Sequence, residues 1–134
     1  VDAGADGTSN GIRSYREINK PKNIHFFKNM ESVDFLKLLV NSKCLVGNSS
    51  VGIRECSFLG VPVVNIGTRQ NRRLRGENVI DTDYNEVAIK NAIKLQLNNP
   101  KKTKSNVYGN GDSGKKIAEV LANTDLHFHK TIMY

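Results

Sequence analysis

The sequence predicts an α/β domain in which a parallel sheet is flanked by helices. Stretches with helical spacing of apolar residues alternate with short apolar runs of strand length at 24–27, 43–47, 61–67 and 78–81. This alternation is typical of parallel sheets, because the chain must return to the starting end of the sheet before the next parallel strand, usually through a helix. The chain has 134 residues, which suits one domain with a buried core. We place this domain at 1–124 and expect a tail at 125–134.

Two helices are predicted in the first third of the chain. The stretch 7–19 carries apolar residues at a spacing of three, which is typical of an amphipathic helix; they are Ile12, Tyr15 and Ile18. The stretch 33–40 follows Ser32, a favourable N-cap residue. Its apolar face is expected to hold Val33, Leu36 and Val40, with Phe35 and Leu39 beside them.

Three further helices are predicted. The stretch 49–59 is followed by Gly60 and Pro62, two residues that commonly end a helix. The stretch 115–122 is the last helix of the domain. The stretch 84–97 has a helical apolar set comprising Val87, Ile89, Ala92, Ile93 and Leu97.

The strands are expected to differ in burial. The runs 43–47 and 61–67 are apolar almost throughout, which indicates strands covered on both faces. The runs 24–27 and 78–81 are shorter. A basic loop at 68–78 separates the last two strands.

The chain is basic, with a net charge of +7 from 20 Lys and Arg against 13 Asp and Glu. This surplus suits nucleic acid, a phosphorylated small molecule or an acidic protein surface, and it equally suits a solvated basic surface. No apolar run approaches the length of a membrane span and no signal-peptide pattern opens the chain, so we expect no membrane partner. Because the first residue is Val1, we expect a piece of a longer protein.

The cysteines and histidines do not have the spacing of a zinc site. Cys44 and Cys56 lie in apolar surroundings, and His127 and His129 fall in the predicted tail. We expect two reduced, buried thiols in a cytoplasmic protein, and neither a metal nor a cofactor.

The turn "NSS" lies where a predicted strand meets a predicted helix. Ligands of open parallel sheets bind at the carboxyl ends of the strands, and a helix N-terminus offers unpaired N–H groups and a positive dipole end to a phosphate. Ser49 and Ser50 add hydroxyl donors, and Gly52 allows close approach to the backbone. Glu55 follows on the same face and can accept hydrogen bonds from a ribose diol. The pattern fits a nucleoside diphosphate, or alternatively a plain N-cap with a surface glutamate.

These motifs also carry a family resemblance. The stretch "VGNSSVGIREC-FLGVPVVNIGTRQ-R-RGENVI", with "DAGADG" near the start, "FFKNM" at 26–30 and "VYGNGDSGKKI" at 107–117, closely resembles the UDP-N-acetylglucosamine 2-epimerases, above all their hydrolysing branch in sialic and nonulosonic acid synthesis. The resemblance covers residues 1 to about 123. It implies a Rossmann-like, UDP-binding domain, the carboxyl-terminal half of a GT-B-type two-domain fold, truncated at its first strands and facing a missing amino-terminal domain.

The resemblance also implies a set of UDP-binding residues. The serines would bind the diphosphate, the glutamate would take the ribose hydroxyls, the arginines would reach the phosphates, and residues 29 and 30 would offer backbone groups to the uracil. A forked, permanent cation at a strand end also suits a diphosphate on physical grounds. The full set is Asn29, Met30, Ser49, Ser50, Gly52, Glu55, Arg69 and Arg73.

Other residues of these motifs receive weaker roles. We expect Arg72 and Arg75 to be solvated. Asp2 would lie at the edge of the cleft, where a helix N-terminal charge is the simpler interpretation. The segment 108–111, "YGNG", is expected to be a turn leading to the last helix.

In the hydrolysing reaction UDP is eliminated across C1 and C2 of UDP-N-acetylglucosamine, and water adds to the intermediate to give N-acetylmannosamine. The family's acid and base carboxylates lie in the amino-terminal domain, so no catalytic residue is assigned here and the chain alone is expected to be inactive. UDP or a UDP-sugar is the expected partner, and a homo-oligomer is compatible with the sequence.

Two alternatives remain for the function. One is the nucleotide-binding domain of a GT-B glycosyltransferase, which would share the fold and the phosphate site. The other is a basic nucleic-acid-binding module, which usually interleaves aromatic residues with its basic ones. The loop "RQNRRLR" has no aromatic residue, so we expect no nucleic-acid partner.

The fold family implies the strand order 3-2-1-4-5-6. The run 24–27 would then be strand 3, and the runs at 43–47, 61–67 and 78–81 would be strands 4, 5 and 6. Strands 1 and 2 would lie upstream and leave a gap. We expect 24–27 to move beside 43–47 through a right-handed crossover.

Overall fold

A computed structural model describes residues 5–98 and 103–125. The chain divides into two compact units, 1–32 and 33–134. In the first unit, helix α1 spans Ala5–Asn19, which confirms the predicted helix and begins it two residues earlier. Its apolar residues Ile12, Tyr15 and Ile18 are 50%, 48% and 79% exposed.

The run 24–27 is not a strand, so this prediction is wrong. Ile24, Phe26 and Phe27 are exposed, and the Arg16 guanidinium lies 5.6 Å from the centroid of the Phe26 ring. A strand is held by hydrogen bonds to a neighbouring strand, and apolar composition alone does not supply them. The expected move of 24–27 beside 43–47 is wrong for the same reason, since the sheet of the described residues consists of three other strands.

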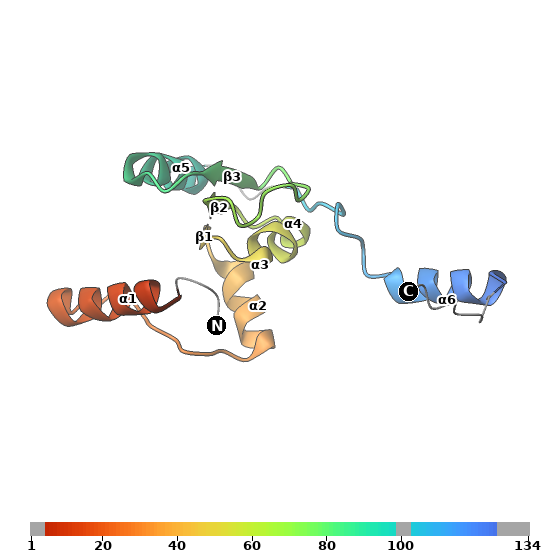
Figure 1. The fold of residues 1–134 in the computed structure, drawn as a ribbon, viewed down its shortest axis with the longest axis horizontal. Coiled ribbons are helices and arrows are strands. Elements are labelled where there is room, and N and C mark those ends of the chain that lie inside the picture. Colours follow the sequence, from red (N-terminus) through yellow and green to blue (C-terminus); the bar gives the residue numbers. More distant parts are fainter. Residues whose placement is uncertain (1–4, 99–102, 126–134) are drawn as a thin grey trace, which may run out of the picture. The chain divides into compact units, whose positions relative to one another are not determined.

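The second unit contains a parallel sheet in the order β1-β2-β3 (Figure 1). Its strands are β1 (Leu45–Gly47), β2 (Val63–Ile66) and β3 (Val79–Thr82). This confirms the α/β class, and the order agrees with the one expected for strands 4, 5 and 6. In the register, Gly47 of β1 pairs with Asn65 of β2, which pairs with Asp81 of β3. The carboxyl ends of all three strands therefore lie at one edge of the sheet.

The strands are less uniformly buried than expected. In β2, Val63, Val64 and Asn65 are almost completely buried, as predicted for a strand covered on both faces. In β1, by contrast, Val46 is 42% exposed. Within the part of the chain that the structure describes, β1 pairs only with β2 and is an edge strand, so the prediction that 43–47 is fully buried is wrong.

The helix predicted at 49–59 is divided into α3 (Ser50–Ile53) and α4 (Glu55–Leu59). The division lies at Arg54, whose φ is −95° and ψ is −71°. The Ser57 hydroxyl lies 2.7 Å from the Ile53 carbonyl oxygen, and this kind of bond to the residue four positions back bends helices. The sequence pattern shows the shared helical face but not the bend.

Gly60 ends α4 as predicted. Its φ of 69° is in the left-handed region, where glycine has no steric penalty. The Gly60 N–H donates to the Ser57 carbonyl at 3.4 Å and the Val61 N–H donates to the Cys56 carbonyl at 3.0 Å. These are the two bonds of a Schellman motif, and they direct the chain back into β2.

Helix α2 spans Ser32–Asn41, so Ser32 is its first residue. The helix is confirmed, but the predicted apolar face of Val33, Leu36 and Val40 is exposed to 64%, 42% and 39%. Leu39 is buried instead, and Phe35 packs against the same core. These two residues are one helical turn apart, and the core cluster that they join, with Cys56, Val61 and Val63, decides which side of α2 is covered.

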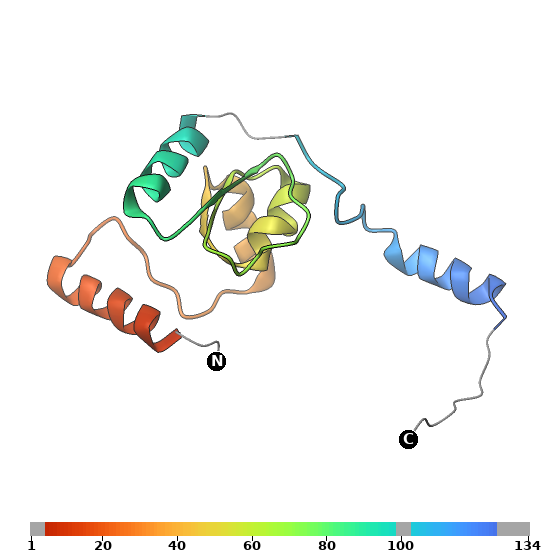
Figure 2. The same cartoon turned by 45° about the horizontal axis from the view of Figure 1, so that its top comes forward.

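Helix α5 spans Glu86–Asn98 and lies on the opposite face of the sheet from α3 and α4 (Figure 2). The helix is confirmed, but Val87 and Leu97 of its predicted apolar set are 66% and 49% exposed. Ala92 of the same set is buried as predicted, and the polar Gln96 is buried although it was not part of the set. Gln96 Nε2 donates at 2.8 Å to the carbonyls of Val63 and Asn78, which explains how an amide is accommodated in this layer.

The last predicted helix is α6 (Ser113–Asn123), which is confirmed. The predicted tail at 125–134 lies outside the described residues except for residue 125, and so do His127, His129 and Asp2. None of the helices that the structure describes is both long enough and apolar enough to cross a bilayer.

Candidate functional site

The predicted phosphate-binding turn follows β1 at the carboxyl edge of the sheet. Ser49 is the N-cap of α3, with extended backbone angles of −72° and 146°, and its Oγ accepts a hydrogen bond from the Val51 N–H at 3.4 Å. Ser50 is the first residue of α3 and is half-buried, whereas Ser49 is exposed. The serine pair thus supplies one capping residue and a second hydroxyl within the first helical turn.

Gly52 has a packing role in this structure. It is buried, and a Cβ at this position would lie 2.9 Å from Val63 Cγ1. Its N–H donates to the Ser49 carbonyl at 3.1 Å. The absence of a side chain therefore allows α3 to pack closely on β2, and the predicted approach of a phosphate to Gly52 stays a prediction.

Glu55, the first residue of α4, faces a pocket of about 450 Å³. Its Oε2 atom is buried and has no hydrogen-bond partner among the residues described. A carboxylate only accepts hydrogen bonds, and a buried acceptor without a donor costs about 1–3 kcal/mol. The predicted contact of Glu55 with ribose hydroxyls stays a prediction.

The "YGNG" turn forms another wall of the pocket that contains Glu55. The Tyr108 hydroxyl donates to the Leu74 carbonyl at 2.9 Å, and the Ser105 N–H donates to the Ser57 carbonyl at 2.9 Å. These bonds attach the segment to α4 and to the basic loop. The turn was predicted from the sequence, but its position beside Glu55 depends on these long-range contacts.

The loop after β2 lies against the turn after β1. Arg69 in this loop is exposed, whereas its neighbour Gln70 is only 3% exposed. Gln70 Nε2 donates to the Asn48 carbonyl at 2.8 Å, and Asn48 directly precedes Ser49. The bond therefore joins the two segments that carry the predicted phosphate-binding groups. The motif "GTRQ" contributed to the family resemblance, but Gln70 itself was not predicted as a site residue.

The remaining arginines of the basic loop have different environments. Arg72 and Arg73 are both exposed, and the predicted contact of Arg73 with a phosphate stays a prediction. Arg75 was expected to be solvated, but its side chain is 23% exposed and its Nε lies 3.0 Å from Asp81 Oδ2. Arg75 Nη1 also donates to the Arg73 carbonyl at 2.7 Å. The prediction for Arg75 is wrong because β3 brings Asp81 beside the loop.

The "GEN" motif at 76–78 forms a buried polar network rather than part of the site. Asn78 is 2% exposed, and its Nδ2 donates to the Val61 carbonyl at 2.9 Å. Its Oδ1 lies 3.0 Å from the Ser57 hydroxyl. A Cβ at Gly76 would lie 2.5 Å from Asn78 Oδ1 and 2.7 Å from Ser57 Oγ. This part of the family motif therefore fastens the strand β3 to α4 and to the start of β2.

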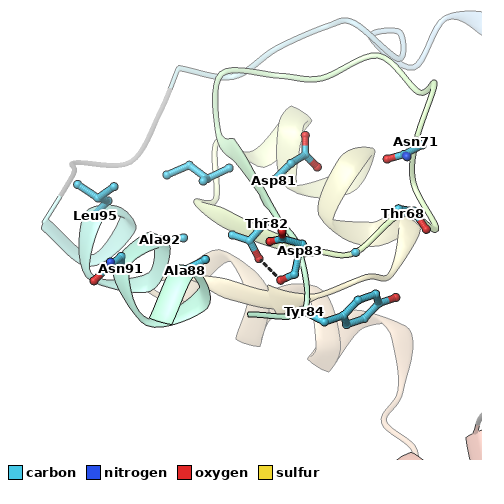
Figure 3. Close-up of a pocket in the computed structure, with 12 residues that line it drawn as sticks. Thr68, Asn71, Asp81, Thr82, Asp83, Tyr84, Ala88, Asn91, Ala92 and Leu95 are labelled. Carbon is cyan, nitrogen blue, oxygen red and sulfur yellow. Dashed lines mark hydrogen bonds between the residues drawn. The ribbon is translucent and has the colours of Figure 1, made fainter. Parts of the chain in front are cut away.

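A second pocket, of about 570 Å³, lies between the end of β3 and α5 (Figure 3). Ala88, Ala92 and Leu95 of α5 form its apolar wall (Figure 3). Thr82 Oγ1 donates to the Asp83 carbonyl at 3.1 Å. Of the predicted UDP-binding residues, none lines this pocket, and Glu55 alone lines the pocket beside α4.

The other site predictions concern residues 29–30 and the cysteines. Asn29 and Met30 belong to the first compact unit, so their contact with a nucleotide bound to the second unit stays a prediction. Cys44 and Cys56 are free thiols; Cys56 is buried as predicted, but Cys44 is only half-buried, so the prediction is wrong for Cys44. Burial, then the neighbouring Glu55 carboxylate and Cys44, raise the pKa of Cys56 to about 12, and burial raises the pKa of Cys44. Both thiols are therefore protonated and unreactive at neutral pH.

Comparison with known proteins decides the family. The family model described as UDP-N-acetylglucosamine 2-epimerase matches residues 4–122. The chain belongs to this family. The match includes the turn after β1, Glu55, the loop after β2 and the "YGNG" turn, so the candidate site lies wholly within the matched region.

Curated relatives of the epimerase family agree with this match. A UDP-N,N'-diacetylbacillosamine 2-epimerase (hydrolyzing) from Legionella pneumophila is 38% identical over 104 residues, which are 78% of this chain and 28% of the relative. A UDP-N-acetylglucosamine 2-epimerase from Neisseria meningitidis serogroup B is 40% identical over 94 residues, which are 68% of this chain and 25% of the relative. The chain thus spans about a quarter of the length of these epimerases.

Proposed function

We propose that the carboxyl edge of this sheet binds the UDP part of a nucleotide sugar. The observation that carries the proposal is the junction of two loops, in which the Asn48–Ser50 turn after β1 meets the Arg69–Gln70 loop after β2 through the 2.8 Å bond between Gln70 and Asn48. The segments that carry Ser49, Ser50 and Arg69 both follow strand ends at the edge where parallel sheets bind ligands, which supports the proposal. Because the chain belongs to the epimerase family, we propose UDP as the ligand.

In this proposal each group contacts the part of UDP that its chemistry suits. The hydroxyls of Ser49 and Ser50 donate to the diphosphate, and the guanidinium groups of Arg69 and Arg73 neutralise its charge. Glu55, which lines a pocket of about 450 Å³, accepts hydrogen bonds from the ribose hydroxyls.

We further propose that the protein containing this chain is a hydrolysing epimerase that converts UDP-N-acetylglucosamine and water to N-acetylmannosamine and UDP. UDP is the leaving group of such an elimination, so negative charge develops on its β-phosphate. The serines and arginines stabilise this charge electrostatically. In this proposal the acid and base that move the protons come from the amino-terminal domain, and the 134-residue chain alone is inactive.

Two nucleotide sugars are candidates for the substrate. UDP-N-acetylglucosamine is supported by the family description and by the relative from Neisseria meningitidis. UDP-N,N'-diacetylbacillosamine is supported by the name of the relative from Legionella pneumophila, which is 38% identical. Both share the UDP part, so the proposed contacts apply to either substrate.

Titration of the chain with UDP, followed by NMR, tests the binding site. We expect a dissociation constant on the order of 0.1–1 mM, equivalent to about 4–5.5 kcal/mol, because the other half of the cleft does not contribute. Ser50→Ala and Glu55→Ala should each weaken binding. Glu119→Ala, which removes an exposed carboxylate from α6, is the control and should bind UDP like the wild type. Unchanged affinity in both site variants would rule out the assignment.

A coupled assay for UDP release tests whether the catalytic acid and base lie outside this chain. The purified 134-residue chain, incubated with UDP-N-acetylglucosamine, should release no UDP, because proton transfer by a positioned acid and base is needed for the elimination. Turnover by this chain would show that it carries its own acid and base. The proposed role of the amino-terminal domain would then be wrong.

A further inference from the structure

Gln70 differs from Asn78, another buried amide, in how it uses its hydrogen-bonding groups. Its Nε2 donates to the Asn48 carbonyl at 2.8 Å, but its Oε1 is buried and has no partner among the described residues. Asn78, which is equally buried, uses both ends of its amide, since its Nδ2 donates to Val61 and its Oδ1 lies 3.0 Å from the Ser57 hydroxyl. Most buried polar groups in proteins are paired in this way.

Packing alone does not account for a glutamine at this position. Methionine has a similar unbranched length and would fill the same space without a buried carbonyl oxygen. The one interaction that methionine cannot make is the bond to the Asn48 carbonyl. The value of Gln70 therefore lies in this bond, which connects the residue before Ser49 to the residue after Arg69.

We propose that Gln70 is a positioning residue of the candidate UDP site. Its side-chain amide fixes the Asn48–Ser50 turn relative to the loop that carries Arg69, so that serine hydroxyls and the guanidinium group meet the same diphosphate. Gln70 itself need not contact the ligand. This inference rests on the proposed function, because it concerns the geometry of the same site.

Gln70→Met tests the inference, and Gln96→Met is its matched control. Gln96 is also a buried glutamine that donates to backbone carbonyls, those of Val63 and Asn78, but it lies on α5. We expect Gln70→Met to bind both UDP and inorganic pyrophosphate about tenfold more weakly, which corresponds to about 1.4 kcal/mol. Its urea unfolding midpoint should change little, because two effects offset each other. The variant loses the stabilising bond to Asn48, but it also loses the unfavourable burial of the Gln70 Oε1 atom without a partner. Gln96→Met should lower the unfolding midpoint and leave the affinity of the folded chain unchanged.

Gln70→Glu supplies a readout that a purely structural role would not change. An ionised carboxylate would place an acceptor against the Asn48 carbonyl, whereas a protonated carboxyl group can donate to it. Burial raises the pKa of a carboxyl group. The affinity of Gln70→Glu for UDP, divided by that of the wild type, should therefore rise as the pH is lowered from about 8 to about 5.

The outcomes separate this inference from the proposed function. If Ser50→Ala weakens UDP binding while folded Gln70→Met binds like the wild type, the inference is wrong and the site assignment stands. A ratio for Gln70→Glu that does not change with pH also overturns the inference. If the wild type does not bind UDP, or if Ser50→Ala and Glu55→Ala both bind like the wild type, the proposed function is wrong and this inference falls with it.

Discussion

Replacement of Asn78 by alanine should destabilise the second unit severely. Asn78 is 2% exposed, and its Nδ2 donates at 2.9 Å to the carbonyl of Val61, a residue with no exposed surface. Truncation leaves that carbonyl buried and unpaired, at a cost of about 1–3 kcal/mol. The space left by the amide adds about 1 kcal/mol. The expected loss of about 2–4 kcal/mol is a large part of the free energy of unfolding of a domain, which is usually about 5–15 kcal/mol.

Urea unfolding, followed by circular dichroism, measures this loss by linear extrapolation. Asn71→Ala is the control, because Asn71 is an exposed asparagine in the same basic loop. Its free energy of unfolding should stay within about 0.5 kcal/mol of the wild type. A loss below about 1 kcal/mol in Asn78→Ala, or equal losses in the two variants, would refute the reasoning that the "GEN" motif fastens the core.

Two further predictions concern packing and a buried thiol. Gly52→Ala should lower the free energy of unfolding by about 1–3 kcal/mol, because the new Cβ would lie 2.9 Å from Val63 Cγ1. Gly114→Ala is the control and should cost nothing, because the space around Gly114 is open; equal losses in the two variants would contradict the packing role of Gly52. The pKa of Cys56 is raised from its usual 9.0 to about 12, so the folded state retains a proton that the unfolded state loses. Stability should therefore fall between about pH 9 and pH 12, and the same pH titration of urea unfolding in Cys56→Ala should show a smaller fall.

Much of the local structure follows from the sequence. The spacing of apolar residues predicted α1, α2 and α5, since helical periodicity is a property of neighbouring residues. Gly60 ends α4 because its left-handed conformation suits glycine. The position of "NSS" between a strand and a helix was likewise evident, and with it the expectation that Ser49 and Ser50 stand at the carboxyl edge of the sheet.

The tertiary structure decided what each segment packs against. The run 24–27 is as apolar as a strand, yet it forms none, because a strand depends on hydrogen bonds to a neighbour distant in sequence. For the same reason α2 buries Leu39 rather than Val33, and α5 buries Gln96, whose amide finds two carbonyls of the sheet. Periodicity identifies a helix and its approximate face, but the partner decides which residues are covered.

The candidate site shows the same division. Ser49, Ser50, Glu55 and Arg69 were predicted from a local turn and a family resemblance, because their chemistry is visible in the sequence. The link between Gln70 and Asn48 was not, since the two residues are 22 positions apart and meet only when β1 and β2 pair. Sequence alone determined which residues are candidates for binding a diphosphate. Only the folded sheet decided that the loop after β2 is joined to the turn after β1, because hydrogen bonds between distant residues form only after the strands are in register.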